Sequence, residues 1–273
     1  MRIFITGASG FIGKNLLDFY SKHQTFGWSR GMDLATELDN FKPDLIIHCA
    51  AEIYNPDLMW DSNIVLTKTC LDYVKVNPQT QMVHLGSSGE YGPVSKASSE
   101  KDLIDPVDMY QATKGMATLM CRGYARNFNL NISIARPYSV FGPGEKPHRL
   151  FPRLYKAYIK NEPMVLFQGY HDFIYIDDFV RGIDILATYE SVPRGEIINL
   201  GSGVQYSNFE INDLFIKYTG IKNAPVEKKE TLQKLFESNF WVCDTTYAWQ
   251  KYKFKTRLSV DEGIVKFLNQ ASY

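Results

Sequence analysis

Short, mostly apolar runs alternate in this chain with longer segments whose apolar residues recur every three or four positions. The short runs predict buried parallel strands, and the longer pattern predicts amphipathic helices. We expect strands at Arg2–Thr6, Thr25–Trp28, Asp44–Cys49, Val83–Gly86 and Ile132–Arg136. We expect helices at Phe11–Lys22, Asp57–Val76, Met109–Phe128 and Phe179–Tyr189, with a closing helix at Ser259–Gln270. This alternation predicts an α/β fold with a doubly wound parallel sheet.

A glycine-rich turn, Thr6-Gly7-Ala8-Ser9-Gly10-Phe11-Ile12-Gly13, follows the first expected strand and leads into a helical pattern. This is the context that a dinucleotide motif requires, because a helix N-terminus offers unpaired N–H groups and a positive dipole end to phosphate. Gly7 would allow the tight turn, Gly10 the approach of the pyrophosphate, and Gly13 the close packing of helix on strand. The spacing is G-x-x-G-x-x-G, so the turn alone leaves a plain strand-turn-helix open.

A tyrosine and a lysine, Tyr110 and Lys114, lie four residues apart near the start of an expected helix. Residues at this spacing share one face, so the ammonium would lower the pKa of the phenol from about 10. Such a phenol can exchange a proton with a sugar hydroxyl or a carbonyl oxygen near neutral pH. Ser87 and Ser88 follow a strand-like run, at a carboxyl end where open α/β sheets place ligands. Together these motifs predict hydride chemistry with a bound dinucleotide.

With these motifs in place, the chain resembles the extended short-chain dehydrogenase/reductase superfamily, in its branch of nucleotide-sugar epimerases, dehydratases and reductases. The resemblance covers nearly the whole chain. It is carried by Gly7, Gly10, Gly13, residues 48–51, Asn63, residues 85–92, Tyr110, Lys114, and residues 135–144, 172–178 and 199–203. It implies a Rossmann-type dinucleotide-binding domain of residues 1–140 plus about 173–200. It also implies a smaller C-terminal substrate-binding domain of residues 141–172 plus 201–273, with substrate in the cleft between them.

The second expected strand ends at Trp28-Ser29-Arg30, where an NAD enzyme usually has an acidic residue. A hydroxyl and a guanidinium suit a 2′-phosphate, so we expect NADP(H) ahead of NAD(H). Arg30 could also begin a solvated loop or stack on adenine. The resemblance implies adenine contacts from Asp33-Leu34, although Asp33 also suits the N-cap of a helix. The expected cofactor-binding residues are Gly7, Gly10, Phe11, Ile12, Gly13, Ser29, Arg30, Asp33, Leu34, Ala50, Ala51, Tyr110, Lys114 and Pro137.

The resemblance also implies catalytic roles. Ser87 would hydrogen-bond the reacting oxygen at sugar C4, Tyr110 would donate or remove the proton there, and Lys114 would bind the nicotinamide ribose. The 4,6-dehydratases carry Asp-Glu at the positions of Ser88-Gly89, so dehydration is not expected. The serine motif and the short cofactor half resemble GDP-4-keto-6-deoxymannose reductase and dTDP-4-dehydrorhamnose reductase. We therefore expect an enzyme, a reductase of a nucleotide-linked 4-keto sugar. The alternatives are a C4 epimerase with retained NAD and a non-catalytic dinucleotide-binding scaffold or sensor.

A nucleotide-diphosphate sugar is the implied substrate. Ser139 stands where many relatives have an asparagine, and His171 where they often have an arginine that helps hold the diphosphate. A hydroxyl makes fewer hydrogen bonds than an amide, and histidine is a pH-dependent replacement. Arg149, Arg153 and Lys156 are basic candidates for phosphate, or a charged helix face. The expected substrate contacts are Ser88, Ser139, Arg149 and His171.

Composition narrows the partners. The chain has 273 residues with 30 basic and 30 acidic side chains, so its zero net charge points to neither nucleic acid nor an anionic membrane. No apolar run approaches the roughly 18 residues of a membrane span, and no signal peptide is expected. The four cysteines lack metal-ligand spacing, which predicts no metal and a reducing cytoplasm. The resemblance implies a role in polysaccharide biosynthesis and a homodimer formed through the helices at Asp57–Val76 and Met109–Phe128.

Overall fold

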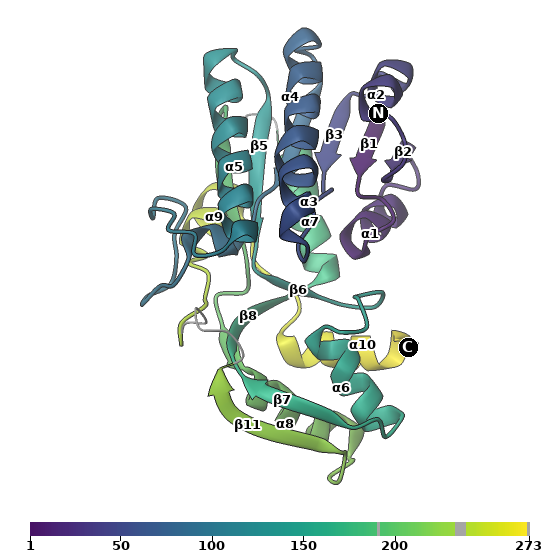
Figure 1. The fold of residues 1–273 in the computed structure, drawn as a ribbon, viewed down its shortest axis with the longest axis vertical. Helices are drawn as coiled ribbons and strands as arrows, with labels where there is room; N and C mark the ends of the chain where they lie inside the picture. Colours follow the sequence, from purple (N-terminus) through teal and green to yellow (C-terminus); the bar gives the residue numbers. More distant parts are fainter. Residues whose placement is uncertain (190–191, 233–238, 272–273) are drawn as a thin grey trace.

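The computed structural model describes residues 1–189, 192–232 and 239–271. Its centre is a six-stranded sheet in the order β2-β1-β3-β4-β5-β9 (Figure 1). Every neighbouring pair in this sheet is parallel, so the predicted α/β class and doubly wound sheet are confirmed. The strands are β1 (Arg2–Thr6), β2 (Gln24–Trp28), β3 (Leu45–His48), β4 (Gln81–Leu85), β5 (Ile132–Pro137) and β9 (Glu196–Leu200).

Helices cover both faces of this sheet. On one face lie α2 (Leu34–Phe41), α4 (Leu66–Val76) and α5 (Met109–Asn127), and on the other α1 (Phe11–Phe19) and α7 (Ile176–Thr188). Alternate residues of a strand point to opposite faces. Phe4 therefore belongs to the apolar core beneath α2, α4 and α5, and Ile3 belongs to the core beneath α1 and α7. Cover on both sides explains why the strands are mostly apolar rather than alternating apolar and polar.

Most of the elements after β5 lie below this sheet in Figure 1, while α9 packs against β9. They build a three-stranded sheet, β10-β8-β6, and a two-stranded sheet, β11-β7. Their apolar residues, including Phe151 and Phe267, are continuous with the core that contains Ile3. The division into two domains at the expected boundaries stays a prediction. The elements are β6 (Ser139–Phe141), α6 (Leu150–Ile159), β7 (Met164–Gln168), β8 (Tyr170–Tyr175), β10 (Gln205–Ser207), α8 (Asn208–Thr219), β11 (Val226–Leu232), α9 (Thr246–Tyr252) and α10 (Val260–Gln270).

One predicted helix has a different internal structure. The segment expected as a helix at Asp57–Val76 consists of α3 (Pro56–Met59), a π-helical turn η1 (Trp60–Val65) and α4. The π turn holds Asn63, whose side-chain amide donates to the hydroxyl of Thr113 at 2.9 Å and whose side-chain oxygen accepts the Glu52 N–H at 2.7 Å. Single π turns inside helices are common near functional sites.

Two helices begin at N-capping side chains. Asp33 accepts the N–H of Thr36 and begins α2, and Ser259 accepts the N–H of Glu262 and begins α10. The helix expected from Phe11 ends at Phe19 rather than at Lys22. Among the described residues, no helix combines the length and the apolar character needed to cross a bilayer.

The order of winding changes at β1, since the chain places β2 on one side of it and β3 on the other. Ligands of open α/β sheets bind at the carboxyl ends of strands beside such a switch point. Gly7, at the end of β1, has φ +68°, and a Cβ there would lie 2.9 Å from the backbone nitrogen of Ala50. The ends of β1 and β3 therefore meet in direct backbone contact at the predicted cofactor site.

Candidate active site

The glycine turn forms a tight cradle between β1 and α1. A Cβ on Gly13 would lie 2.3 Å from the carbonyl oxygen of Gly7 and 2.7 Å from the Cα of Ala8, so only glycine permits this packing. Gly10 precedes α1, and no side chain caps the first turn, where Phe11 and Ile12 are half-buried. The open N–H groups of this turn and the absent side chains fit the pyrophosphate of a dinucleotide.

The end of β3 borders the same cradle, and β5 ends at the same edge of the sheet. The hydroxyl of Thr6 accepts the N–H groups of Cys49 and Ala50, at 3.1 and 3.0 Å, which fixes the chain as it leaves β3. Ala50, Ala51 and Pro137 are all half-buried. The structure thus places these predicted cofactor contacts at the carboxyl edge of the sheet, in the neighbourhood of the glycine turn.

Arg30, expected to bind a 2′-phosphate, is paired with an acidic residue. Its guanidinium donates to Glu52 at 3.1 Å, and its side chain remains 69% exposed. Partial burial of Glu52 raises its pKa, but backbone N–H groups, first that of Tyr54, and Arg30 outweigh burial and lower the pKa to about 2. The carboxylate is therefore ionised at neutral pH and occupies one side of the Arg30 guanidinium.

The other residues expected to contact the adenosine part of the cofactor differ in exposure. Ser29 is half-buried and Asp33 is exposed, with its carboxylate engaged at the N-cap of α2. Leu34 is only 4% exposed and packs in the core with Leu38. The predicted cap is confirmed, and the adenine contacts of Asp33 and Leu34 stay predictions.

Ser87, Tyr110 and Lys114 converge at the carboxyl end of β4. Ser87 begins the short 3-10 helix η2 (Ser88–Tyr91), and Tyr110 and Lys114 lie in the first two turns of α5. The Ser87 hydroxyl lies close enough to the phenol of Tyr110 to act on its pKa. The Lys114 ammonium is 4% exposed and donates to the carbonyl oxygen of Leu85. Two hydroxyl groups and a buried ammonium therefore gather beside one strand end.

The electrostatics of this group differ from the expectation of a lowered tyrosine pKa. Burial raises the pKa of Tyr110, and the neighbouring Ser87 hydroxyl and the charge of Arg149 oppose that rise only in part. Burial lowers the pKa of Lys114, while the nearby carboxylate of Glu90 raises it. The expectation of a lowered Tyr110 pKa is wrong for this arrangement, because burial is the largest influence and the ammonium is directed to a backbone carbonyl.

A buried carboxylate beneath Ser87 is a feature that sequence reasoning missed. Glu90, on η2, is fully buried and pairs with Arg136 of β5 at 2.8 Å. It also accepts the backbone N–H of Ser87 and the hydroxyl of Thr118. The only sequence signal was an acidic residue inside the serine motif, where the resemblance assigned it no role.

Among the expected substrate contacts, Ser139 and His171 lie together. The Ser139 hydroxyl of β6 is 3.4 Å from Nδ1 of His171 on β8, and β6 pairs with β8. Sequence spacing could not reveal this pair, because 32 residues separate the two side chains. The structure does bring these two predicted residues to one place.

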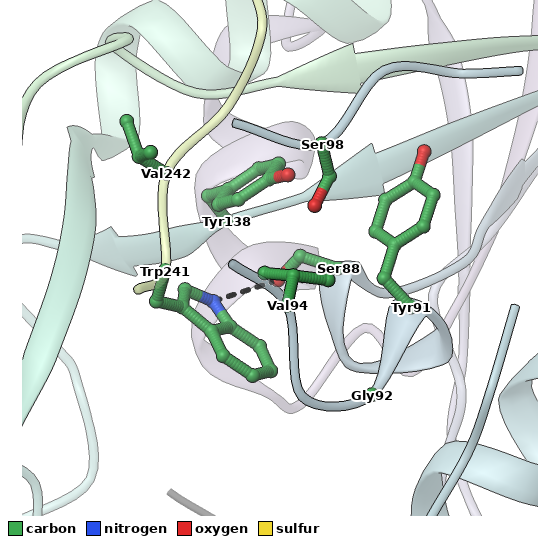
Figure 2. Close-up of a pocket in the computed structure, with 8 residues that line it drawn as sticks. All are labelled: Ser88, Tyr91, Gly92, Val94, Ser98, Tyr138, Trp241 and Val242. Carbon is green, nitrogen blue, oxygen red and sulfur yellow. Dashed lines mark hydrogen bonds between the residues drawn. The ribbon is translucent and has the colours of Figure 1, made fainter. Parts of the chain in front are cut away.

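Ser88 lines a small, closely packed pocket (Figure 2). The indole N–H of Trp241 donates to the Ser88 hydroxyl at 3.3 Å, and Tyr138 and Val242 also line the space. The segment that carries Trp241 is held against the loop after η2 by the N–H of Ser98, which donates to the Val242 carbonyl at 3.0 Å. Trp241, 153 residues away in sequence, is a second residue that sequence reasoning missed.

Arg149 lies at the N-cap of α6 and pairs with Glu145 at 3.1 Å. Its charge acts on the phenol of Tyr110, which places it near the catalytic candidates. His148 beside it contacts the hydroxyl of Tyr54 at 2.6 Å. Arg153 donates instead to the carbonyl of Val165, on β7. Of these basic residues, Arg149 is the one whose charge acts on Tyr110.

No metal cluster is evident in the described part of the chain. Among residues 1–189, 192–232 and 239–271, no three His, Cys, Asp or Glu side chains are grouped as metal ligands. The four cysteines are free thiols.

Comparison with known proteins identifies the family. Residues 3–201 match the family described as the NAD dependent epimerase/dehydratase family. The chain belongs to the NAD-dependent epimerase/dehydratase family. This membership confirms the resemblance to extended short-chain dehydrogenase/reductases, and with it an enzyme family that uses a nicotinamide dinucleotide.

Three relatives indicate the range of this family. The chain is 30% identical over 235 residues to a GDP-6-deoxy-D-talose 4-dehydrogenase of Aggregatibacter actinomycetemcomitans, covering 78% of this chain and 79% of that one. It is 29% identical over 255 residues to a UDP-glucuronate 4-epimerase of Thermodesulfobacterium geofontis, covering 86% and 75%. It is 24% identical over 263 residues to a dTDP-D-glucose 4,6-dehydratase of Dictyostelium discoideum, covering 77% of this chain but only 60% of that longer protein.

A solved structure matches almost end to end. The UDP-glucuronic acid 4-epimerase of Bacillus cereus, in complex with UDP-glucuronic acid and NAD, aligns with a TM-score of 0.88 and 25% identity. The alignment covers 99% of this chain and 98% of that one. The Rossmann-type architecture of this family member is thereby confirmed.

Proposed function

We propose that the protein is a C4 epimerase of a nucleotide-linked sugar that retains NAD through its catalytic cycle. The observation that carries the proposal is the convergence of Ser87, Tyr110 and Lys114 at the end of β4, in a sheet whose switch point holds the glycine cradle. The end-to-end likeness to a UDP-glucuronic acid 4-epimerase supports epimerisation ahead of the reductase expected from sequence.

In this proposal the side chains act on the hydroxyl at C4. Tyr110 removes the proton of that hydroxyl as C4 is oxidised and returns it after reduction from the opposite face. Ser87 hydrogen-bonds the same oxygen, since its hydroxyl lies beside the phenol of Tyr110. Bound NAD would supply the hydride acceptor and donor. The positive charge of Arg149 favours ionised Tyr110 while the proton is away.

The cofactor residues of the proposal are those of the cradle and its borders. The open first turn of α1 would hold the pyrophosphate, and Asp33 with Ser29 would lie on the adenosine side. Glu52 supports NAD over NADP, because an ionised carboxylate 3.1 Å from Arg30 competes with a 2′-phosphate for the guanidinium. This reverses the order of preference expected from sequence.

The proposal takes its substrate residues from both expected domains. We assign the sugar to Ser88 and Ser139, and the diphosphate to His171 and Arg149. The cleft would lie between a domain of residues 1–140 plus about 173–200 and a domain of the remainder. Exposed apolar side chains on the helices expected to dimerise, among them Trp60 and Leu119, support a homodimer.

A second function has one specific observation in its favour. The 30% identity to a GDP-6-deoxy-D-talose 4-dehydrogenase supports oxidoreduction at C4 with release of the keto sugar. The two functions share Ser87, Tyr110 and Lys114 and differ in whether the intermediate leaves the site.

Product analysis tests the proposal. The purified protein, without added cofactor, is incubated with UDP-glucuronic acid, UDP-glucose and a GDP-6-deoxyhexose, and the products are analysed by NMR. Epimerisation predicts a C4 epimer of one of these sugars and no accumulated NADH. Turnover only with stoichiometric NAD(P)H or NAD(P)⁺, yielding a 4-keto or reduced sugar, would replace the epimerase by the second function.

A further inference from the structure

Glu90 carries a charged side chain that is fully buried beside the sheet. The carboxylate of Glu90 has no exposed surface and sits between β4, β5 and α5. One oxygen accepts the Ser87 N–H and the Thr118 hydroxyl, each at 2.8 Å, and the other accepts the Arg136 guanidinium at 2.8 Å. A Cβ on Gly86 would lie 2.5 Å from the first oxygen, so the backbone is closely packed around the carboxylate.

Stability alone gives no reason for this pair. Desolvating two charges can cost more than their attraction returns, and well-packed apolar residues are often as stable as a buried ion pair. The contacts of Glu90 instead point to Ser87 and α5. Tyr110, Lys114 and Thr118 are spaced four residues apart and therefore share one face of α5, and Glu90 contacts the last of them.

We propose that Glu90 is a positioning residue that fixes the backbone of Ser87 against the face of α5 that carries Tyr110 and Lys114. The proposal rests on the catalytic assignment made above. The hydrogen bond from the Ser87 N–H fixes the backbone from which the Ser87 hydroxyl projects. The bond from Thr118 holds that backbone at a fixed position relative to α5. Without these bonds the two hydroxyls would not be held at one substrate oxygen, and misplacement of about 1 Å costs on the order of 100-fold in rate.

Arg136 completes the support. It donates to the Tyr91 hydroxyl at 2.9 Å, and Tyr91 donates to the side-chain oxygen of Asn199 on β9 at 2.8 Å. The network thus joins η2, α5, β5 and β9, and a polar network whose members all have partners is rigid. The charge of Glu90 also acts on the reacting groups, because it favours the protonated forms of both Lys114 and Tyr110.

The test separates position from stability. In the first variant, Glu90→Leu is combined with Arg136→Met, which removes both buried charges and leaves no unpaired ion. In the second, Thr118→Val removes one hydroxyl and keeps the ion pair. The control pairs Asp178→Asn with Arg181→Met, because this ion pair in α7 is also largely buried but contacts none of the catalytic candidates.

We expect kcat at least 30-fold lower in the Glu90/Arg136 variant and about threefold to tenfold lower in the Thr118 variant. The KM of the sugar and the Kd of NAD should change by less than threefold, while the control keeps its kcat. The limb of the kcat–pH profile that reports Tyr110 and Lys114 should move to lower pH when the Glu90 charge is removed. The other titratable groups around them are unchanged in these variants: His48, His84, Cys49, Cys121, Asp108 and Arg149.

A Glu90/Arg136 variant with kcat within threefold of the parent and an unmoved pH limb would overturn the proposal. If that variant does not fold, the Thr118 variant decides: a kcat within 1.5-fold of the parent would overturn the proposal, and the expected loss would support it. Failure of the catalytic assignment itself is recognised separately, because Tyr110→Phe would then leave turnover unchanged.

Discussion

Substituting Gly13 by alanine tests the dinucleotide cradle by a single methyl group. The added Cβ would lie 2.3 Å from the Gly7 carbonyl oxygen and 2.7 Å from the Cα of Ala8. Real Cβ atoms do not come closer than about 3.0 Å to other heavy atoms, so α1 must move away from the turn by about 0.7 Å. Because both obstacles are backbone atoms, no side-chain rotation can relieve the contact.

The size of the effect follows from the hydrogen bonds that the helix N-terminus would make to phosphate. A bond of about 2.9 Å lengthened by that shift becomes about 3.6 Å, which is no longer a hydrogen bond. Each bond to a charged group contributes about 1.5–3 kcal/mol, so losing one or two weakens binding by roughly 10-fold to 10⁴-fold. Overpacking costs about 1–3 kcal/mol, and the gain in helix propensity of about 1 kcal/mol offsets part of it.

The assay is NAD binding by calorimetry on protein stripped of nucleotide, together with the melting temperature. Gly123→Ala is the matched control, because this exposed glycine of α5 has no atom within 4 Å of the added Cβ. The control should bind NAD normally and melt slightly higher, as expected for glycine to alanine in a helix. If Gly13→Ala binds NAD within threefold of the parent, the cradle does not hold the pyrophosphate.

Three further predictions concern other residues. Tyr110→Phe should lower kcat by about 10²–10⁴ with little change in KM, as measured by product formation, and unchanged turnover would refute its role as acid and base. Arg30→Ala should change the Kd of NADH and NADPH by similar factors, because Glu52 already occupies the guanidinium; a loss confined to NADPH would instead support the 2′-phosphate role. Burial raises the pKa of Glu100 to about 7 from 4.5, so the folded state keeps a proton that the unfolded state has released, and stability falls as pH rises from 4.5 to 7. Glu100→Gln should therefore raise the melting temperature more at pH 8 than at pH 5, and equal gains at both pH values would contradict this.

The parts of the fold that could be predicted are those set by local pattern. A strand buried on both faces must be a mostly apolar run, and the spacing of Tyr110 and Lys114 places both on one helix face whatever surrounds them. The helix cap at Asp33 could be predicted for the same reason, since its partner Thr36 lies only three residues away. The π turn at Trp60–Val65 could not be predicted, because it widens the helix while leaving the apolar spacing close to that of an α-helix.

The missed features depend on residues that meet only in three dimensions. Glu90 and Arg136 are 46 residues apart, and pattern alone predicts apolar side chains at such buried positions. The Glu52 carboxylate that binds Arg30 follows another strand, and its presence favours NAD over the NADP(H) expected from sequence. The pKa of Tyr110 was misjudged because helix spacing reveals a neighbouring charge but not the degree of burial.

The nucleotide bound to the purified protein tests the central claim most directly. Protein prepared without added cofactor is denatured, and the released nucleotide is identified and counted by mass spectrometry and absorbance. An epimerase that recycles its own hydride predicts NAD⁺ at close to one equivalent per chain. An empty site that afterwards binds NADPH more tightly than NADH would contradict the epimerase and favour a reductase that exchanges its cofactor in every turnover.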